Sequence, residues 1–200
     1  MDFEWLNLPA PQAARELLGC RLVSTIGDGR VEARIVEVEA YDQNDPASHT
    51  FKGQTPRNKA MFLSAGHAYV YLSYGIHHCL NVVCGQAGFG AGVLVRAVEP
   101  LVGLEVVAAR RPTARKEWTN GPGKVCQALG VDLSLTGHDL CEPPLQLKRE
   151  QLRADERILE TTRIGISKAA EVPHRFYISE HPDASRRDRA AERNLRNPSG

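Results

Sequence analysis

The sequence predicts an α+β fold, a single mixed domain built on an antiparallel β-sheet with flanking helices. The chain has 200 residues, a common size for one domain, which leaves enough chain to bury a core. Its composition, 42% hydrophobic and 24% charged, is that of an ordinary globular protein. Its candidate strands follow one another through glycine turns of the kind found in hairpins. We therefore expect one domain over residues 1–200.

The N-terminal elements are a helix and two strands. Ala10–Leu18 has the apolar spacing of a helix that packs one face on a core. Arg21–Thr25 and Arg30–Tyr41 have strand character and are joined by a hairpin-type turn at 26–29. This order predicts a helix followed by an antiparallel pair.

The strand Arg30–Tyr41 changes the phase of its apolar alternation between Val31–Ile35 and Val36–Ala40. Either both faces of the strand are buried, or a β-bulge redirects its side chains. Beyond the change of phase, Glu37, Glu39 and Tyr41 share one face.

The remaining elements follow a Gly- and Pro-rich loop at 42–59. A turn at Gly75 and a glycine-rich loop at 85–92 separate three further strands. Those strands are His67–Leu72, Cys79–Cys84 and Val93–Val98, then come helices at Leu101–Arg110 and Gly121–Leu129, and late strands at Gly165–Ser167 and Arg175–Ser179. The Arg-rich stretch from Arg186 to Gly200 is expected to fray.

Charge is unevenly distributed along the chain. No Asp or Glu lies between Pro46 and Val98, whereas the first 45 residues carry an excess of acids. The acid-free segment tolerates an anionic partner. Equally, core strands carry few charges of either sign, and composition leaves both interpretations open.

Several features bear on compartment and assembly. The five cysteines are odd in number and form no CxxC pair, so neither a disulfide framework nor a cysteine zinc site is favoured. No apolar run is long enough for a membrane span, and the N-terminus has no secretory pattern. We expect a monomer in an intracellular, reducing compartment, the cytoplasm if the source is bacterial.

Three of the five tyrosines lie within Tyr69–Tyr74. On a strand Tyr69 and Tyr71 point the same way, while Tyr74 falls at the turn beside Gly75. An aromatic side chain on a turn is exposed, and such residues serve as wedges or stacking platforms for nucleic-acid bases. Tyrosine-rich strands of ordinary sheets are the commoner interpretation.

Two charged residues interrupt apolar strands. Glu39 stands near the end of its strand, where partial burial raises a carboxylate's pKa toward the range of a general base. A solvent-facing glutamate or an ion-pair partner is the commoner interpretation. Arg96 lies among apolar residues and needs a partner, either a structural one or a carboxylate in a pocket.

Familiar cofactor motifs are missing from the sequence. Gly121–Lys124 does not have the spacing of a phosphate-binding P-loop, although a helix N-terminus with Lys124 can hold one phosphate. His77 and His78 are adjacent and point to opposite faces of a strand, which disfavours a metal site. Neither GxSxG nor HExxH occurs.

Six blocks of sequence, in the same order along the chain, carry a resemblance to a known family that spans about residues 17–179. The sequence resembles the alkyladenine (3-methyladenine) DNA glycosylase family of mammals and many bacteria. The blocks are Ile35–Tyr41, Gly53–Asn58, Tyr69–Gly75, Cys79–Asn81, Val93–Ala97 and Gly121–Leu129. The resemblance implies a single mixed domain with a curved antiparallel sheet and no cofactor.

The resemblance also implies roles at matching positions. Glu39 is the expected general base that deprotonates the attacking water, and Arg96 helps to position that water. Tyr41 and Tyr71 sandwich the flipped base, and His49 hydrogen-bonds it at the side of the pocket.

Other positions are implied to discriminate bases or contact DNA. Asn81 crowds the 2-amino group of normal guanine, and Tyr74 is the wedge that fills the gap in the duplex. Ile76 stands where relatives carry a methionine in the minor groove, and Ser73 replaces a usual apolar residue. The remaining expected DNA contacts are Thr55, Arg57 and Lys124.

The implied function is that of a monofunctional DNA glycosylase of base excision repair. Such an enzyme flips alkylated or deaminated purines from duplex DNA and hydrolyses the N-glycosidic bond, which leaves an abasic site. No lysine falls on a catalytic position, so no lyase step is expected. Two alternatives are a non-enzymatic module that binds distorted DNA and a hydrolase of free nucleosides or small glycosides. The pair Glu39 and Arg96 disfavours the first, and the exposed Tyr74 disfavours the second.

Overall fold

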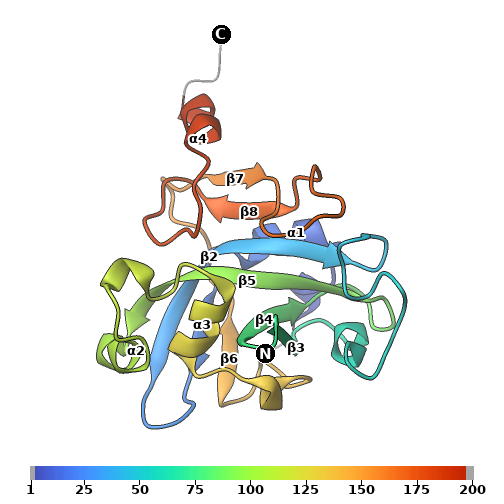
Figure 1. Cartoon of the computed structure of the whole chain (residues 1–200), viewed down its shortest axis with the longest axis horizontal. Coiled ribbons are helices and arrows are strands. Elements are labelled where there is room, and N and C mark those ends of the chain that lie inside the picture. The colour runs from blue at the N-terminus through green and yellow to red at the C-terminus, as the bar shows by residue number, and fades with distance from the viewer. Residues whose placement is uncertain (1–2, 197–200) are drawn as a thin grey trace.

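The computed structural model describes residues 3–196, and these form an antiparallel sheet flanked by helices (Figure 1). The strand order is β3-β4-β5-β2-β1-β6, and the hairpin β7-β8 joins the sheet through β8, which pairs with β2. The predicted α+β fold with a curved antiparallel sheet is confirmed. The strands are β1 Arg21–Ser24, β2 Val31–Asp42, β3 Ala68–Ser73, β4 His77–Val83, β5 Ala91–Val102, β6 Leu145–Lys148, β7 Ile158–Thr161 and β8 Arg175–Ile178.

The helices cover the sheet and its ends. They are α1 Ala10–Leu17, α2 Leu104–Arg110, α3 Pro122–Leu129 and α4 Arg189–Arg196. Short 3-10 turns lie at Glu4–Leu6, Lys59–Phe62, Arg115–Glu117 and Leu133–Leu135. Helix α1 packs on β2 and β5, whereas α3 packs on β4 and β5. Figure 1 shows α4 beyond the β7-β8 hairpin, at the far end of the molecule from α3.

The long strands β2 and β5 form the middle of the sheet and carry the residues on which the site depends. Most side chains of β2 are buried on both faces, and its register with β5 also shifts around Glu37. Ile35 pairs with Val98, Glu37 with Ala97 and Val38 with Val95, so Val36 and Arg96 have no partner across the pair. Both interpretations of the broken apolar alternation are therefore confirmed. Bulges of this kind re-aim side chains, and this one frees Arg96 from the ladder register.

The main apolar cluster of the core joins the sheet to α1 and α3, and smaller clusters lie around Met61 and around Tyr177. The helical members of the main cluster lie on single faces, for example Ala13 and Leu17 of α1 and Val125 and Leu129 of α3. Burying one leucine side chain stabilises a fold by ~1.5–3 kcal/mol. The helical spacing predicted for Ala10–Leu18 is thus confirmed, and it fixes α1 behind the strands that carry the site.

The start of α2 differs from the sequence-based expectation. Leu101 and Val102 continue β5, and the helix begins only after Gly103. Gly103 has φ +75°, and a Cβ there would lie 2.1 Å from the carbonyl oxygen of Arg30. Only glycine permits this close approach of two backbones, which separates the strand from the helix.

Three late segments also differ from the expectation. Gly165–Ser167 is a loop and not a strand, and Gly165 there has φ +76°. The sequence does not predict strands β6 and β7, because each has only four residues, too few for a pattern of alternation to stand out from a loop. The expected late strand at Arg175–Ser179 is β8.

The Arg-rich C-terminal stretch forms α4 where fraying was expected. Asp188 accepts hydrogen bonds from the N–H groups of Ala190 and Ala191, which begins the helix. Glu192 is buried, accepts the N–H of Glu180 and pairs with Arg187 at 2.8 Å. Such individual partners are not visible in composition. Residues 197–200 of the expected frayed tail lie outside the described residues.

Candidate active site

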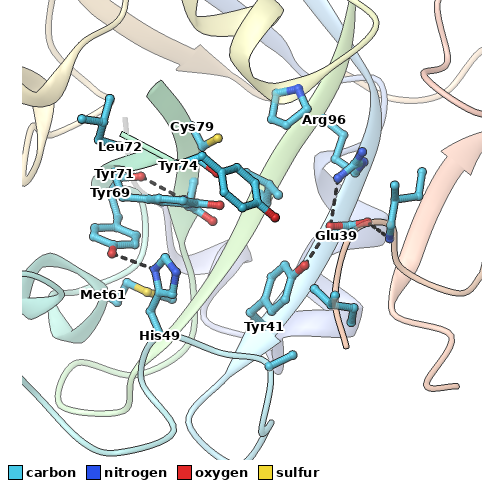
Figure 2. A pocket seen from close by; sticks show the side chains of 18 of the residues that line it. Glu39, Tyr41, His49, Met61, Tyr69, Tyr71, Leu72, Tyr74, Cys79 and Arg96 are labelled. Carbon is cyan, nitrogen blue, oxygen red and sulfur yellow. Dashed lines mark hydrogen bonds and ion pairs between the residues drawn. The ribbon is translucent and has the colours of Figure 1, made fainter. Parts of the chain in front are cut away.

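A cavity of about 450 Å³ opens beside the end of β2, between the β3-β4 hairpin and the loop that follows β7 (Figure 2). We call it the Glu39 cavity. Eight of the predicted site residues line it: Glu39, Tyr41, His49, Arg57, Tyr71, Tyr74, Asn81 and Arg96. These residues come from β2, β3, the β3-β4 turn, β4, β5 and the 43–58 loop, and only the tertiary fold brings them together.

Glu39 is fully buried and its carboxylate receives three hydrogen bonds from protein groups. Oε2 accepts from the Tyr41 hydroxyl at 2.8 Å and from Nη1 of Arg96 at 3.2 Å. Oε1 accepts from the backbone N–H of Ile164 at 2.8 Å. An ionised carboxylate has about four acceptor sites, so one remains for a further donor from the cavity.

Arg96 has the partners that its place in an apolar strand requires, and they are two carboxylates. Its Nε donates to Glu37 at 3.2 Å while Nη1 donates to Glu39. Burial alone would lower the pKa of Arg96, but the charges of Glu39 and Glu37 more than offset it and leave that pKa above its usual value. The guanidinium therefore stays charged and holds Glu39 in one orientation.

Glu37 completes this buried network on the side away from the cavity. It accepts from Arg175 at 3.0 Å and from the hydroxyl of Ser185 at 2.8 Å. Two glutamates and two arginines thus share a buried site in which every charge has an opposite neighbour. Buried ion pairs persist only with such complete hydrogen bonding.

Aromatic rings form one wall of the cavity. The rings of Tyr69 and Tyr71 are stacked, with centroids 5.8 Å apart, as expected for residues on one face of a strand. The His49 ring lies edge-on to Tyr71 at 4.5 Å, and its Nδ1 bonds the Tyr69 hydroxyl at 2.9 Å. Tyr71 is therefore held between two neighbours.

Tyr41 stands across the cavity from Tyr71 (Figure 2). Burial, with the adjacent charge of Glu39, raises the pKa of Tyr41 well above its usual value. Its hydroxyl therefore remains a donor to Glu39. Two tyrosines thus face a shared space, which suits a flat aromatic guest.

His49 lines the same space and is kept neutral. The ring is exposed at the mouth of the cavity, yet the surrounding walls remove enough water to lower its pKa, and the charge of Arg57 adds to this effect. With Nδ1 engaged by Tyr69, Nε2 is the nitrogen left for a guest.

Asn81 is buried on β4, opposite Tyr69 of β3 and Leu94 of β5. Its Nδ2 donates to the backbone oxygen of Tyr69 at 3.1 Å. This bond holds the amide against the sheet, where it forms part of the cavity floor.

The tip of the β3-β4 hairpin projects an exposed apolar pair. Tyr74 is 89% exposed and Ile76 is 69% exposed, which confirms the expected exposure of Tyr74. Tyr74 has φ +50° and Gly75 has φ +75°, and the N–H of Ile76 bonds the carbonyl of Ser73 at 3.1 Å, as in a type I′ turn. Tyrosine at φ > 0 is strained, and such residues cluster at functional sites.

The other expected DNA contacts lie at different distances from the cavity. Arg57 is exposed at its rim and donates to the carbonyl of Leu72 at 3.3 Å. Thr55 does not line the cavity and caps a turn by accepting the N–H of Asn58. Lys124 does not line it either; its ammonium pairs with Glu117 at 2.5 Å and with Asn120 at 2.7 Å.

The acid-free segment divides into buried strands and an exposed loop, and the place it offers an anionic partner stays a prediction. Strands β3 and β4 and the first part of β5 are largely buried, as core strands should be. The stretch 51–57 is exposed and carries Lys52 and Arg57 without any acid. The exposed part lies next to the cavity mouth, where Arg57 lines the rim.

Two contributors to the site are missed by sequence reasoning. Ile164 acts through its backbone N–H, for which a sequence carries no signal. Arg163 lies in a polar stretch of the sequence that has no apolar periodicity. The strand pattern places Glu37 on the face of Glu39, but without a role.

Among residues 3–196 no group of three His, Cys, Asp or Glu side chains is placed to hold a metal ion. Within the same range, no helix has the length and hydropathy to cross a membrane.

Comparison with known proteins assigns the chain to a family. The model of the methylpurine-DNA glycosylase family matches residues 4–182. Relatives named "Putative 3-methyladenine DNA glycosylase" include one from Methanoculleus marisnigri, 49% identical over 87% of this chain and 92% of the relative. Another, from Nitrosospira multiformis, is 49% identical over 86% and 87% of the two chains, and one from Methanocella arvoryzae is 44% identical over 92% and 94%.

The fold places a buried carboxylate in an aromatic cavity. Together with these matches, this defines the chain as a DNA glycosylase, an enzyme that hydrolyses N-glycosyl bonds. Within that class, the chain belongs to the methylpurine-DNA glycosylase family.

Proposed function

We propose that this enzyme takes an alkylated or deaminated purine, flipped from duplex DNA, into the Glu39 cavity and hydrolyses its N-glycosidic bond. The observation that carries the proposal is the fully buried Glu39, which lines an aromatic cavity and has three of about four acceptor positions taken by protein donors. A base in a duplex is not accessible to such a cavity, so the nucleotide must leave the stack.

In the chemical step Glu39 acts as the general base. A water bound at its open acceptor position gives its proton to the carboxylate as the oxygen attacks C1′ of the sugar. The C1′–N bond breaks, and its electron pair leaves with the purine. A cationic alkylated purine departs as a neutral base, whereas a neutral purine such as hypoxanthine must also gain a proton or hydrogen bonds.

Arg96 is proposed to orient both the carboxylate and the water. Arg96 lies at the bulge between β2 and β5, and from there its guanidinium points at Glu39. Glu37 holds the guanidinium at its Nε. Because both glutamates hold Arg96 charged, it also offsets the negative charge that Glu39 brings near DNA phosphates.

The base is proposed to stack between Tyr41 and Tyr71, with His49 at its edge. A desolvated cationic purine gains roughly 2 kcal/mol from a facing aromatic ring. Neutral His49 adds no repulsion to a cationic guest. Asn81 on the cavity floor is positioned to exclude bases with an additional exocyclic amine, because its amide is tied to the sheet and cannot swing away.

The exposed hairpin tip is proposed to enter the duplex. Tyr74 would occupy the space of the departed base, and Ile76 would contact the minor groove beside it. Arg57 at the rim and Thr55 and Lys124 farther out are proposed phosphate contacts. Lys124 would exchange Glu117 for a phosphate, since the two are paired in the free protein.

The proposal is tested with duplexes that each carry one defined lesion. Released base and alkali-labile abasic sites are measured against an undamaged duplex and against the free nucleoside of the same base. Release from the lesion duplex alone supports the proposal. Release from the free nucleoside alone would indicate a small-molecule hydrolase, and tight binding without release would indicate a binding module.

A further inference from the structure

A second buried arginine, Arg163, lies behind the cavity wall and has no part in the chemistry described above. Its side chain is fully buried, but it does not line the cavity. Its Cζ lies 4.7 Å from the centroid of the Tyr41 ring, over one face of that ring. Because Tyr41 lines the cavity and Arg163 does not, the covered face is the one turned away from a guest.

The guanidinium of Arg163 connects three segments around Tyr41. Both of its terminal nitrogens bond the carboxylate of Asp45, with Nη2 3.1 Å from Oδ1. Nη1 also donates to the carbonyl of Ala40 at 3.1 Å, and Nη2 donates to that of Ala169 at 3.2 Å. Ala40 immediately precedes Tyr41, so this contact fixes the backbone from which the ring extends.

The two segments joined by the Arg163–Asp45 ion pair both reach the cavity. Asp45 accepts the N–H of Ala47 at 2.9 Å, and Ala47 lines the cavity. The residue after Arg163 is Ile164, whose N–H bonds Glu39 at 2.8 Å. Movement of Arg163 would therefore displace the Tyr41 ring and, through the adjoining peptide, a donor of Glu39.

We propose that Arg163, held by Asp45, is a positioning residue of this enzyme that fixes the Tyr41 ring and its hydroxyl against Glu39. The inference rests on the proposed function of the Glu39 cavity. A planar guanidinium suits the task, because it can bond a carboxylate and two carbonyls in its plane while its face lies on a ring. Rates respond strongly to such placement, with ~100-fold losses for ~1 Å of misplacement.

The test removes the ion pair without leaving a buried charge unpaired. The double variant Arg163→Met, Asp45→Asn replaces both charges, and the introduced asparagine can still accept the N–H of Ala47. The matched control is Arg34→Met, Glu156→Gln, which removes another buried ion pair whose members do not line the cavity. Arg163→Lys is the second test variant, since it keeps the charge but loses the planar bonding.

Two quantities are measured for each variant. One is the single-turnover rate of base release from a lesion duplex at saturating enzyme. The other is the Kd for the same duplex with a 2′-fluorine on the lesion sugar, which slows cleavage. We expect both Arg163 variants to lose ~10- to ~100-fold in rate, while the control keeps the wild-type rate. Because Tyr41 also faces the base, Kd should rise, but by a smaller factor than the rate falls. Rates equal to the control for both Arg163 variants would overturn the inference.

A double-mutant cycle separates this role from general support of the fold. In the Tyr41→Ala background the ring is absent, so loss of Arg163 and Asp45 should reduce the rate much less than in wild type. Fully additive losses would contradict a role through Tyr41. Wild-type protein that released no base would overturn the proposed function, and this inference with it.

Discussion

Nη1 of Arg96 donates a 3.2 Å hydrogen bond to Oε2 of Glu39, and Nε of the same guanidinium donates to Glu37. One cation thus lies between two fully buried carboxylates, at a point where β5 departs from its register with β2. The same contact supports the fold and orients Glu39, the proposed general base. The two roles lead to separate measurements.

Replacing Arg96 by Met should destabilise the protein strongly. Removal of one partner of a buried ion pair typically costs ~3–5 kcal/mol, because the remaining charge is left uncompensated. For a chain of this length that corresponds to a fall in Tm of roughly 6–20 °C. Thermal unfolding measures the effect, with Arg57→Met as the control at an exposed site that should shift Tm little. A wild-type Tm for the Arg96 variant would mean that the network contributes nothing to the fold.

Tyr74→Ala should separate base extraction from chemistry. Without the wedge, the flipped base returns to the stack more readily, and unstacking costs least in single-stranded DNA. Excision from well-paired duplex should therefore weaken much more than excision from a single strand. The ratio of the two single-turnover rates is the measurement. If that ratio matches wild type, Tyr74 is an ordinary exposed turn residue.

Phosphate contacts at the cavity rim should appear in the salt dependence of DNA binding. We expect the affinity for undamaged duplex to fall steeply with salt. Arg57→Ala should reduce the slope of log K against log salt by about 0.9, the contribution of one neutralised phosphate. Arg30→Ala is the control, because this exposed arginine precedes the opposite end of β2, about 30 Å from Glu39. A slope that Arg57→Ala leaves unchanged would remove that residue from the interface.

Stability should fall as the pH drops below about 6.5, the ordinary pKa of an exposed histidine. Loss of surrounding water lowers the pKa of His49, His174 and His181 in the folded protein, so the unfolded chain binds more protons in acid. Folding stability then rises with pH through this window and is lost below it. Tm at pH 8 and at pH 5.5 measures the difference, and His181→Gln should reduce it. Equal Tm values would contradict the lowered pKa values.

The sequence predicts the elements of the fold where local pattern is strong and fails where tertiary contacts decide. The broken alternation around Val36 predicts either burial on both faces or a bulge, and β2 has both; the glycine turn at Gly75 predicts the β3-β4 hairpin. By contrast, α4 depends on the individual contacts of Asp188 and Glu192, and the loop at Ile164 is shaped around Glu39. Neither leaves a periodic signal.

The candidate site shows the same division. Motif resemblance identifies eight of the residues that line the cavity, because the proposed roles belong to their side chains and their identities are specific. It does not separate Thr55 and Lys124, which lie outside the cavity, from Arg57 at its rim. Arg163 leaves no signal in the sequence because its importance comes from Asp45, which is distant along the chain, and from contacts with backbone carbonyls.

The rate of base release by Glu39→Gln from a duplex carrying a neutral lesion tests the general-base role of Glu39 most directly. Glutamine keeps the size of the side chain but cannot take the proton of the water, and loss of a general base typically lowers a rate by ~10²–10⁴-fold. The control is Glu32→Gln, a change on the same strand outside the cavity. We expect a loss of this size for Glu39→Gln with lesion binding retained, and a wild-type rate for Glu32→Gln. Near-wild-type turnover by Glu39→Gln would contradict the mechanism.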